Sequence, residues 1–207
     1  MIVHDCIQGT TEWLSVRAGI PTASMFDQII TPKTGKPSAS AEGYMLRLLA
    51  ERILKRPVEQ QAFSGWMDRG SAMESDAVAF YEFQRSLDTV KVGFITNDAG
   101  TIGASPDRLV GDEGLLEIKC PSEAVHMGYL LHGSLGEKHK PQVQGQLWVT
   151  GRMWSDTLSY HPELPPALIR VERDNAYIAA LSAAVEAFAG SLAEATEMAR
   201  VKGWIKP

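Results

Sequence analysis

Apolar residues recur at helical spacing through the first 85 positions of the chain, so this part is expected to be mainly helical. A helix is predicted from Thr10 or Thr11 to Gly19, and a second, short helix begins at Thr22. Positions 31–40 are rich in Pro, Gly, Ser and Lys, which predicts an exposed loop. Two longer helices are predicted over about 42–55 and 68–84; their apolar stripes are Leu46, Leu49 and Ile53 in the first and Met73, Ala77, Phe80 and Tyr81 in the second.

The pattern changes to that of strands in the middle of the chain. One strand is predicted over 90–96, and two more lie within 101–121, joined by a tight Gly-Asp-Glu-Gly turn. The predicted elements that follow are a helix, a loop over 133–140, a helix from Pro141 to Thr150, strands over 154–161 and 167–173, and an Ala-rich helix from Asn175 to about Val201. This order predicts an α/β or α+β fold in which helices flank a central mixed β-sheet, with residues 1–207 as a single domain.

The charge balance argues against a broad basic surface. The chain has 20 Lys and Arg against 25 Asp and Glu, a net charge of −5, whereas non-specific nucleic-acid binders usually carry an excess of basic residues. Basic residues gathered along one cleft or channel remain compatible with this balance, because net charge says nothing about distribution. DNA therefore stays open as a partner.

Cysteine, histidine and hydropathy patterns exclude several classes of protein. Cys6 and Cys120 lie in no paired spacing, so a zinc or iron–sulfur site held by cysteines is not expected. His126, His132 and His139 do not match zinc spacing either and are expected in loops or on the surface. No signal-like N-terminus and no run of 18 apolar residues is found. We expect a cytoplasmic protein with no membrane partner.

The most informative stretch runs from Ser105-Pro106-Asp107 to Glu117-Ile118-Lys119. Side chains alternate on a strand, so Glu117 and Lys119 share one face and Ile118 lies on the other. A hairpin would bring Asp107 to within about one residue of Glu117 or Lys119. Two neighbouring carboxylates suit a hard cation such as Mg²⁺, and a lysine beside them can stabilise charge on a phosphate. The simpler interpretation is an exposed strand with a cross-strand salt bridge, because so short a pattern is common by chance.

Three further segments accompany the two halves of this pattern, and the five form a series. In order, the five segments cover 13–24, 70–74, 104–107, 116–121 and 142–148. With this series the sequence resembles the PD-(D/E)xK nuclease superfamily, and more closely the lambda-exonuclease and YqaJ-type viral recombinase family. The resemblance implies a restriction-endonuclease-like core. It also implies a metal-dependent deoxyribonuclease.

The resemblance implies roles by position in the active site. Asp107 and Glu117 match metal-binding acids, with the Ile118 carbonyl as a further ligand, and Lys119 matches the catalytic lysine. Glu74 matches an acid that supports a second metal ion, although a solvated helix acid is the alternative. Gln142 matches a glutamine that contacts the active-site water or phosphate, although it could be a surface residue. Of Gln144 and Gln146, one side chain is expected to be exposed.

The resemblance also implies a pocket for a terminal 5′-phosphate. Arg17 and Ser24 match residues of that pocket, and Ser105 would complete it. The planar fork of an arginine suits phosphate oxygens. The alternative interpretation is an N-cap serine and a surface arginine.

The activity implied is 5′→3′ exonuclease action on double-stranded DNA ends. It would use Mg²⁺, or Mn²⁺, with two ions per active site. It would degrade the 5′-phosphorylated strand and leave a 3′ overhang for a single-strand annealing protein. A homotrimeric ring is implied, in a bacterial host or encoded by a prophage. Two alternatives stay open: an endonuclease or junction resolvase of the same superfamily, and a non-catalytic scaffold that binds DNA ends.

Overall fold

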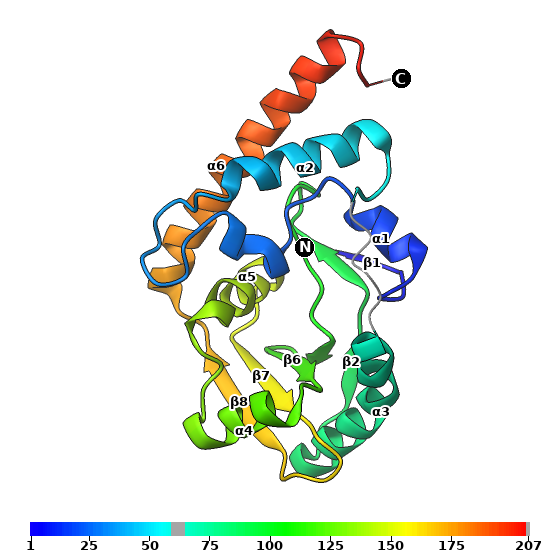
Figure 1. Cartoon of the computed structure of the whole chain (residues 1–207), viewed down its shortest axis with the longest axis vertical. Coiled ribbons are helices and arrows are strands. Elements are labelled where there is room, and N and C mark those ends of the chain that lie inside the picture. Colours follow the sequence, from blue (N-terminus) through cyan, green and yellow to red (C-terminus); the bar gives the residue numbers. More distant parts are fainter. Residues whose placement is uncertain (59–64, 206–207) are drawn as a thin grey trace.

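A five-stranded mixed sheet forms the centre of the computed structural model, which describes residues 1–58 and 65–205, the side chains of 65–72 excepted. Its strand order is β2 (Thr89–Lys91), β5 (Arg108–Val110), β6 (Gly114–Lys119), β7 (Trp154–Ser159) and β8 (Ala167–Glu172). Strands β6 and β7 pair in parallel and the other pairs are antiparallel. The parallel pair is joined through helices α4 (Glu123–His132) and α5 (Lys140–Thr150) (Figure 1).

Helices cover both faces of this sheet. Helix α3 (Gly65–Arg85) packs Ala77 and Tyr81 against Leu116 and Leu158. On the other face, Leu115 packs with side chains of α4 and α5. The predicted mixed sheet flanked by helices is therefore confirmed (Figure 1).

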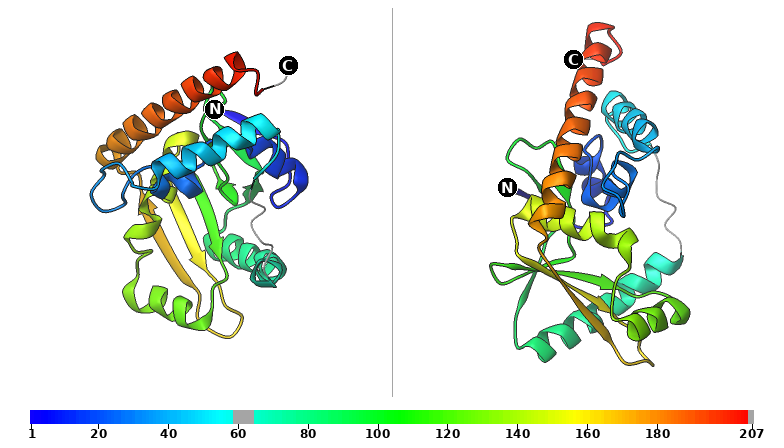
Figure 2. Two further views of the ribbon diagram at one scale, coloured as in Figure 1. Left: turned by 45° about the horizontal axis from the view of Figure 1, so that its top comes forward. Right: turned by 90° about the vertical axis from the view of Figure 1, so that its left-hand side faces the viewer.

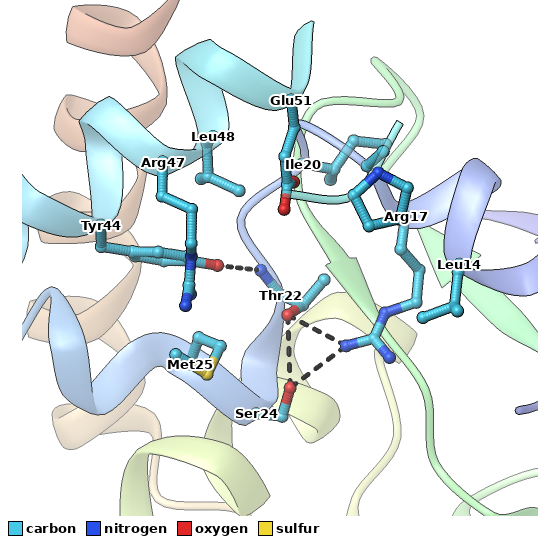
Figure 3. Close-up of a pocket in the computed structure, with 12 residues that line it drawn as sticks. Leu14, Arg17, Ile20, Thr22, Ser24, Met25, Tyr44, Arg47, Leu48 and Glu51 are labelled. Carbon is cyan, nitrogen blue, oxygen red and sulfur yellow. Dashed lines mark hydrogen bonds between the residues drawn. The ribbon is translucent and has the colours of Figure 1, made fainter. Parts of the chain in front are cut away.

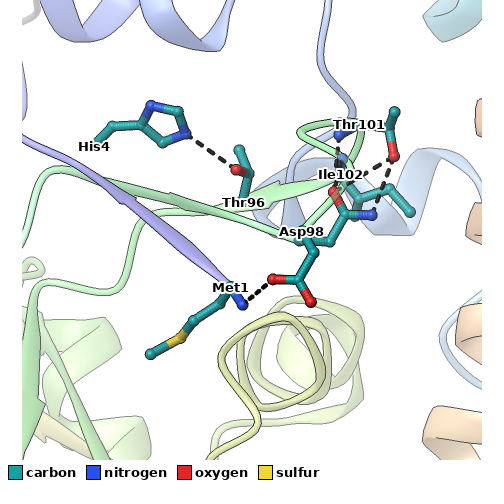
Figure 4. A network of polar contacts seen from close by, with 7 residues as sticks. Met1, His4, Thr96, Asp98, Thr101 and Ile102 are labelled. Carbon is teal, nitrogen blue, oxygen red and sulfur yellow. Dashed lines mark hydrogen bonds and ion pairs between the residues drawn. The ribbon is translucent and has the colours of Figure 1, made fainter.

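A second, smaller layer carries the N-terminal helices. Strands β1 (Ile2–His4), β3 (Phe94–Thr96) and β4 (Gly103–Ala104) form a three-stranded sheet beside α1 (Thr11–Arg17) and the 3₁₀ helix η1 (Ala23–Gln28). Polar contacts tie this sheet together: His4 Nε2 lies 3.0 Å from Thr96 Oγ1, and the Met1 ammonium pairs with Asp98 (Figure 4). The Asn97 side chain accepts hydrogen bonds from the amides of Thr101 and Ile102 in the turn before β4. These bonds hold the turn that precedes β4, and Ser105 and Asp107 follow directly after β4.

The long helices α2 (Ala41–Leu54) and α6 (Asn175–Val201) pack over this layer (Figure 2). Helix α6 has the predicted bounds, and the Asp174 side chain caps it by accepting from the Tyr177 amide at 2.9 Å. By length and composition α6 is apolar enough to cross a membrane. However, Leu181, Val185 and Leu192 are fully buried in the core shared with α2 and η1, and an apolar core helix has the same composition.

Two predictions about these elements are wrong. Segment 90–96 is not one strand: β2 pairs with β5 in the large sheet, and β3 pairs with β1 in the small one. The chain changes sheets at Gly93, where an added Cβ would lie 1.9 Å from the Cys6 carbonyl oxygen, so only glycine fits. In α2, Leu46 is 54% exposed, and the buried residues are Tyr44 and Leu48. Leu49 packs against the core as predicted, so the predicted apolar stripe is wrong at Leu46.

Candidate active site

The β5–β6 hairpin brings Asp107 and Glu117 together. The register pairs Arg108 with Leu116 and Val110 with Gly114, which sets Asp107 opposite Glu117. Asp107 Oδ2 accepts a hydrogen bond from the Ile118 amide at 2.6 Å. The expected proximity of these residues is therefore present in the structure. The tight turn uses Gly111 in the left-handed region, at φ 50°.

Strand β6 separates an apolar face from a charged one. Leu116 and Ile118 pack toward α3, as the alternation predicts. Glu117 and Lys119 lie on the α5 side, where Lys119 Nζ is 3.4 Å from Glu117 Oε1. Both side chains are largely buried, and burying a charge is costly unless it has partners.

Helix α5 supplies those partners. Gln142 Nε2 donates to Glu117 Oε1 at 2.9 Å, and Gln146 Nε2 donates to Glu117 Oε2 at 3.0 Å. The expectation that Gln144 or Gln146 is exposed is wrong, because each is only 2% exposed. Sequence reasoning thus missed Gln146, although its spacing of four from Gln142 places both on one helix face.

Repulsion among acids characterises the environment of Asp107. Burial raises the pKa of Asp107 well above its ordinary value, and the negative charges of Glu117 and Glu74 raise it further. The Ile118 amide and Lys119 oppose this rise. Glu74 itself lies on α3, with Oε1 3.2 Å from Lys91 Nζ, so its direct partner is a lysine rather than Asp107.

The oxygen donors of this hairpin fit a hard cation. Within the described part of the chain, no group of three or more His, Cys, Asp and Glu side chains is arranged to hold a metal ion. Two carboxylates and the Ile118 carbonyl nevertheless offer oxygen alone, which is the ligand type that Mg²⁺ and Mn²⁺ prefer. A cation between Asp107 and Glu117 would also relieve the repulsion that raises the Asp107 pKa.

A second cluster surrounds Arg17 (Figure 3). Arg17 Nη2 lies 3.4 Å from both Thr22 Oγ1 and Ser24 Oγ. The guanidinium also stacks 3.9 Å from the centre of the Trp13 ring. Arg17, Thr22 and Ser24 border a cavity of about 270 Å³ whose other walls include Tyr44. Arg17 and Ser24 are thus brought together as expected, and Thr22 joins them.

The charge of Arg17 is poorly compensated. Burial lowers the pKa of Arg17 to about 10, while the charge of Glu51 opposes that effect. Among the described residues, no carboxylate oxygen lies within the 4.0 Å of an ion pair with this guanidinium. A partly buried cation whose close partners are neutral hydroxyls and an aromatic ring is suited to receive an anion.

Trp13 links Ser105 to this cluster. The Ser105 hydroxyl accepts a hydrogen bond from Trp13 Nε1 at 3.2 Å, and the same indole donates to the Gly93 carbonyl at 3.1 Å. Ser105 is not among the residues that line the Arg17 cavity. Trp13, the first residue of the 13–24 segment, therefore connects Ser105 with Arg17.

A second cavity, the connecting cavity, has a volume of about 220 Å³ and lies between Ser24 of the Arg17 cluster and Gln142, the partner of Glu117. Ser24, Asp27, His139 and Gln142 are among its lining residues. Ser24 also borders the Arg17 cavity, and Gln142 bonds to Glu117. The candidate phosphate pocket and the acidic hairpin are therefore neighbours on one surface.

Two of the three histidines, His126 and His139, are more buried than expected. His126 is fully buried, with Nδ1 2.7 Å from Ser159 Oγ and Nε2 2.9 Å from the Pro165 carbonyl. His139 lines the connecting cavity, and its pKa is lowered to about 4 by burial and by the charges of Lys119 and Lys138. His139 is therefore neutral at pH 7. Only His132 is exposed as expected.

Comparison with solved structures finds close likeness to a nuclease. An alkaline exonuclease (LHK-Exo) from Laribacter hongkongensis shares 35% identity, with a TM-score of 0.81 over 94% of this chain and 98% of that one. The same enzyme in complex with dAMP matches equally well. A phage-related exonuclease from Haemophilus somnus 129PT, at 15% identity, has the same fold, with a TM-score of 0.68 over 88% of this chain and 96% of that one. Comparison with curated proteins gave no match.

The family follows from the sequence match. The model of the YqaJ-like viral recombinase domain matches residues 12–153, which include Arg17, Asp107, Glu117 and Gln142. Together with the alkaline exonuclease, this match confirms the prediction of a nuclease. The chain belongs to the family of the YqaJ-like viral recombinase domain.

Proposed function

We propose that the protein is a Mg²⁺-dependent 5′→3′ exonuclease that degrades the 5′-phosphorylated strand of linear double-stranded DNA and leaves 3′ overhangs. One observation carries the proposal: Ser24 of the Arg17 cluster and Gln142, which donates to Glu117 of the hairpin, line the same connecting cavity. A terminal phosphate bound at Arg17 would direct the following phosphodiester toward the hairpin. An endonuclease would have no need of such a pocket.

The acidic hairpin would perform the hydrolysis. Asp107, Glu117 and the Ile118 carbonyl would hold the cation, with Glu74 positioned to support a second ion. When bound, the cation would polarise the phosphodiester and lower the pKa of a bound water. Lys119 would orient that water or stabilise the charge that develops on the phosphate. Gln142 reaches both Glu117 and the connecting cavity, so it would contact the bound phosphate or water.

The related structures support the exonuclease assignment. LHK-Exo is an alkaline exonuclease and was solved with dAMP, a deoxynucleoside monophosphate. A monophosphate is the product expected when nucleotides are removed one at a time from an end. We further propose a cytoplasmic homotrimeric ring that passes its 3′ overhang to a single-strand annealing protein.

The proposal is tested by digestion of linear duplex DNA that has one 5′-phosphorylated end and one 5′-hydroxyl end, with a closed circle as control. Mg²⁺ should cause loss of the 5′-phosphorylated strand alone, and EDTA should stop it. Cutting of the circle would indicate an endonuclease. If no substrate is cut in the presence of metal, the protein would instead be a non-catalytic scaffold that binds DNA ends.

A further inference from the structure

Both oxygens of the Glu117 carboxylate are bound by amides from one helix. Gln142 holds Oε1 at 2.9 Å and Gln146 holds Oε2 at 3.0 Å. A carboxylate in this position only accepts hydrogen bonds, so each amide must present its nitrogen to Glu117. The orientation of both glutamines is therefore fixed by the acid that they contact.

The two glutamines differ in what else they can reach. Gln142 is half-buried and lines the connecting cavity, so it can meet DNA. Gln146 is 2% exposed and cannot touch a substrate. Its Oε1 has no hydrogen-bond partner among the described residues, which destabilises the fold relative to an apolar residue of similar shape. The hydrogen bond from Gln146 Nε2 to Glu117 offsets this cost.

We propose that Gln146 is a positioning residue for the metal centre, holding the Glu117 carboxylate in the orientation that binds the cation. This inference rests on the proposed function. A carboxylate held at one oxygen can still turn about its last torsion, which has a broad energy minimum, whereas a second donor on the other oxygen fixes its plane. Each oxygen has about two lone-pair positions, and Oε1 also has Lys119 Nζ at 3.4 Å, so Oε2, the oxygen held by Gln146, keeps one position for a cation.

The same helix offers a matched control. Gln144 is as deeply buried as Gln146 and also makes its contacts through its amide group. Its Nε2 donates to the Glu172 carbonyl at 2.9 Å, and its Oε1 accepts from the Asp174 amide at 2.9 Å. These bonds join α5 to the end of β8 and to the N-cap of α6, on the side of the helix away from Glu117. Loss of Gln144 therefore perturbs the packing of α5 without releasing Glu117.

The test measures Mn²⁺ binding to the DNA-free protein by titration calorimetry. Gln146→Leu should weaken Mn²⁺ binding about 10- to 100-fold, the usual effect of losing a residue that orients a metal ligand. Gln146→Met provides a second apolar variant if Gln146→Leu does not fold. Gln144→Leu should lower the melting temperature and leave Mn²⁺ affinity unchanged. In EDTA, Gln146→Leu should bind a 5′-phosphorylated DNA end as the parent does.

The outcomes separate this inference from the proposed function. Parent-like Mn²⁺ affinity in folded Gln146→Leu or Gln146→Met would overturn the inference and leave the nuclease proposal standing. Equal weakening in Gln144→Leu would assign the effect to α5 packing and also overturn it. A parent protein that neither binds Mn²⁺ nor digests DNA would refute the proposed function, and the inference with it.

Discussion

Replacement of Arg17 should abolish the preference for phosphorylated ends. Arg17 is partly buried, its close described partners are the Thr22 and Ser24 hydroxyls and the Trp13 ring, and no described carboxylate pairs with it. A terminal phosphate would therefore be its principal opposite charge. Arg17→Ala removes that charge and leaves the acidic hairpin in place, because Arg17 bonds to Thr22 and Ser24 and not to the hairpin.

The size of the effect follows from the bonds that would be lost. A hydrogen bond to a charged group contributes about 1.5–3 kcal/mol. Since about 1.4 kcal/mol corresponds to a tenfold change in rate, the ratio of digestion rates for phosphorylated and hydroxyl ends should fall roughly 10- to 150-fold. Arg17→Lys should recover only part of the ratio, because an ammonium lacks the planar fork.

The assay compares initial rates on two duplexes that differ only in the 5′ group. Arg200→Ala is the matched control: it removes one arginine from the exposed end of α6, where Arg200 pairs with Glu197. Arg200→Ala should keep the parent's ratio. If Arg17→Ala also keeps that ratio, or if the parent digests both ends equally, the phosphate pocket is misassigned.

Three further changes test other parts of the structure. Lys119→Ala should lower the cleavage rate at least about 100-fold while calorimetry shows Mn²⁺ binding retained; cleavage at the parent's rate would remove Lys119 from the mechanism. Asp107→Asn should melt above the parent at pH 8 in EDTA and level with it below the ordinary Asp pKa of about 3.9. The sign follows because a carboxyl with a raised pKa keeps its proton longer when folded, so the parent loses stability as pH rises; a lower-melting variant at pH 8 would contradict it. Asp156→Ala should cost about 1–3 kcal/mol in denaturant unfolding, because the buried Tyr81 hydroxyl loses its acceptor at 2.9 Å while Arg170 is exposed enough to be hydrated; an unchanged midpoint would show that Tyr81 finds another partner.

The local parts of the site were predictable from sequence. Strand alternation placed Glu117 and Lys119 on one face, and the Gly-rich turn placed Asp107 across from them. The ends of a helix were also predictable where the capping residue and the composition indicate the same boundary, as for α6 at Asn175 and Val201. In each case the deciding interactions lie within a few residues along the chain.

The parts that failed depend on packing between distant segments. The split of 90–96 into two strands is set by the approach of the Cys6 carbonyl to Gly93, 87 positions away. His126 of α4 can be buried because Ser159 of β7 and the Pro165 carbonyl in the following loop supply hydrogen-bond partners for its ring nitrogens. Gln146 could have been found from its spacing to Gln142, but only if α5 was already known to lie over Glu117. Contacts between residues that are far apart in the chain cannot be predicted from the local pattern of apolar and polar residues.

The central claim is that the β5–β6 hairpin is the metal centre of the nuclease, and diffraction from crystals grown with Mn²⁺ tests it most directly. The anomalous map should place manganese against the carboxylates of Asp107 and Glu117, with Glu117 still bonded to Gln142 and Gln146. Manganese bound elsewhere, with none at Asp107 in crystals of a protein that cleaves DNA with Mn²⁺, would contradict the claim.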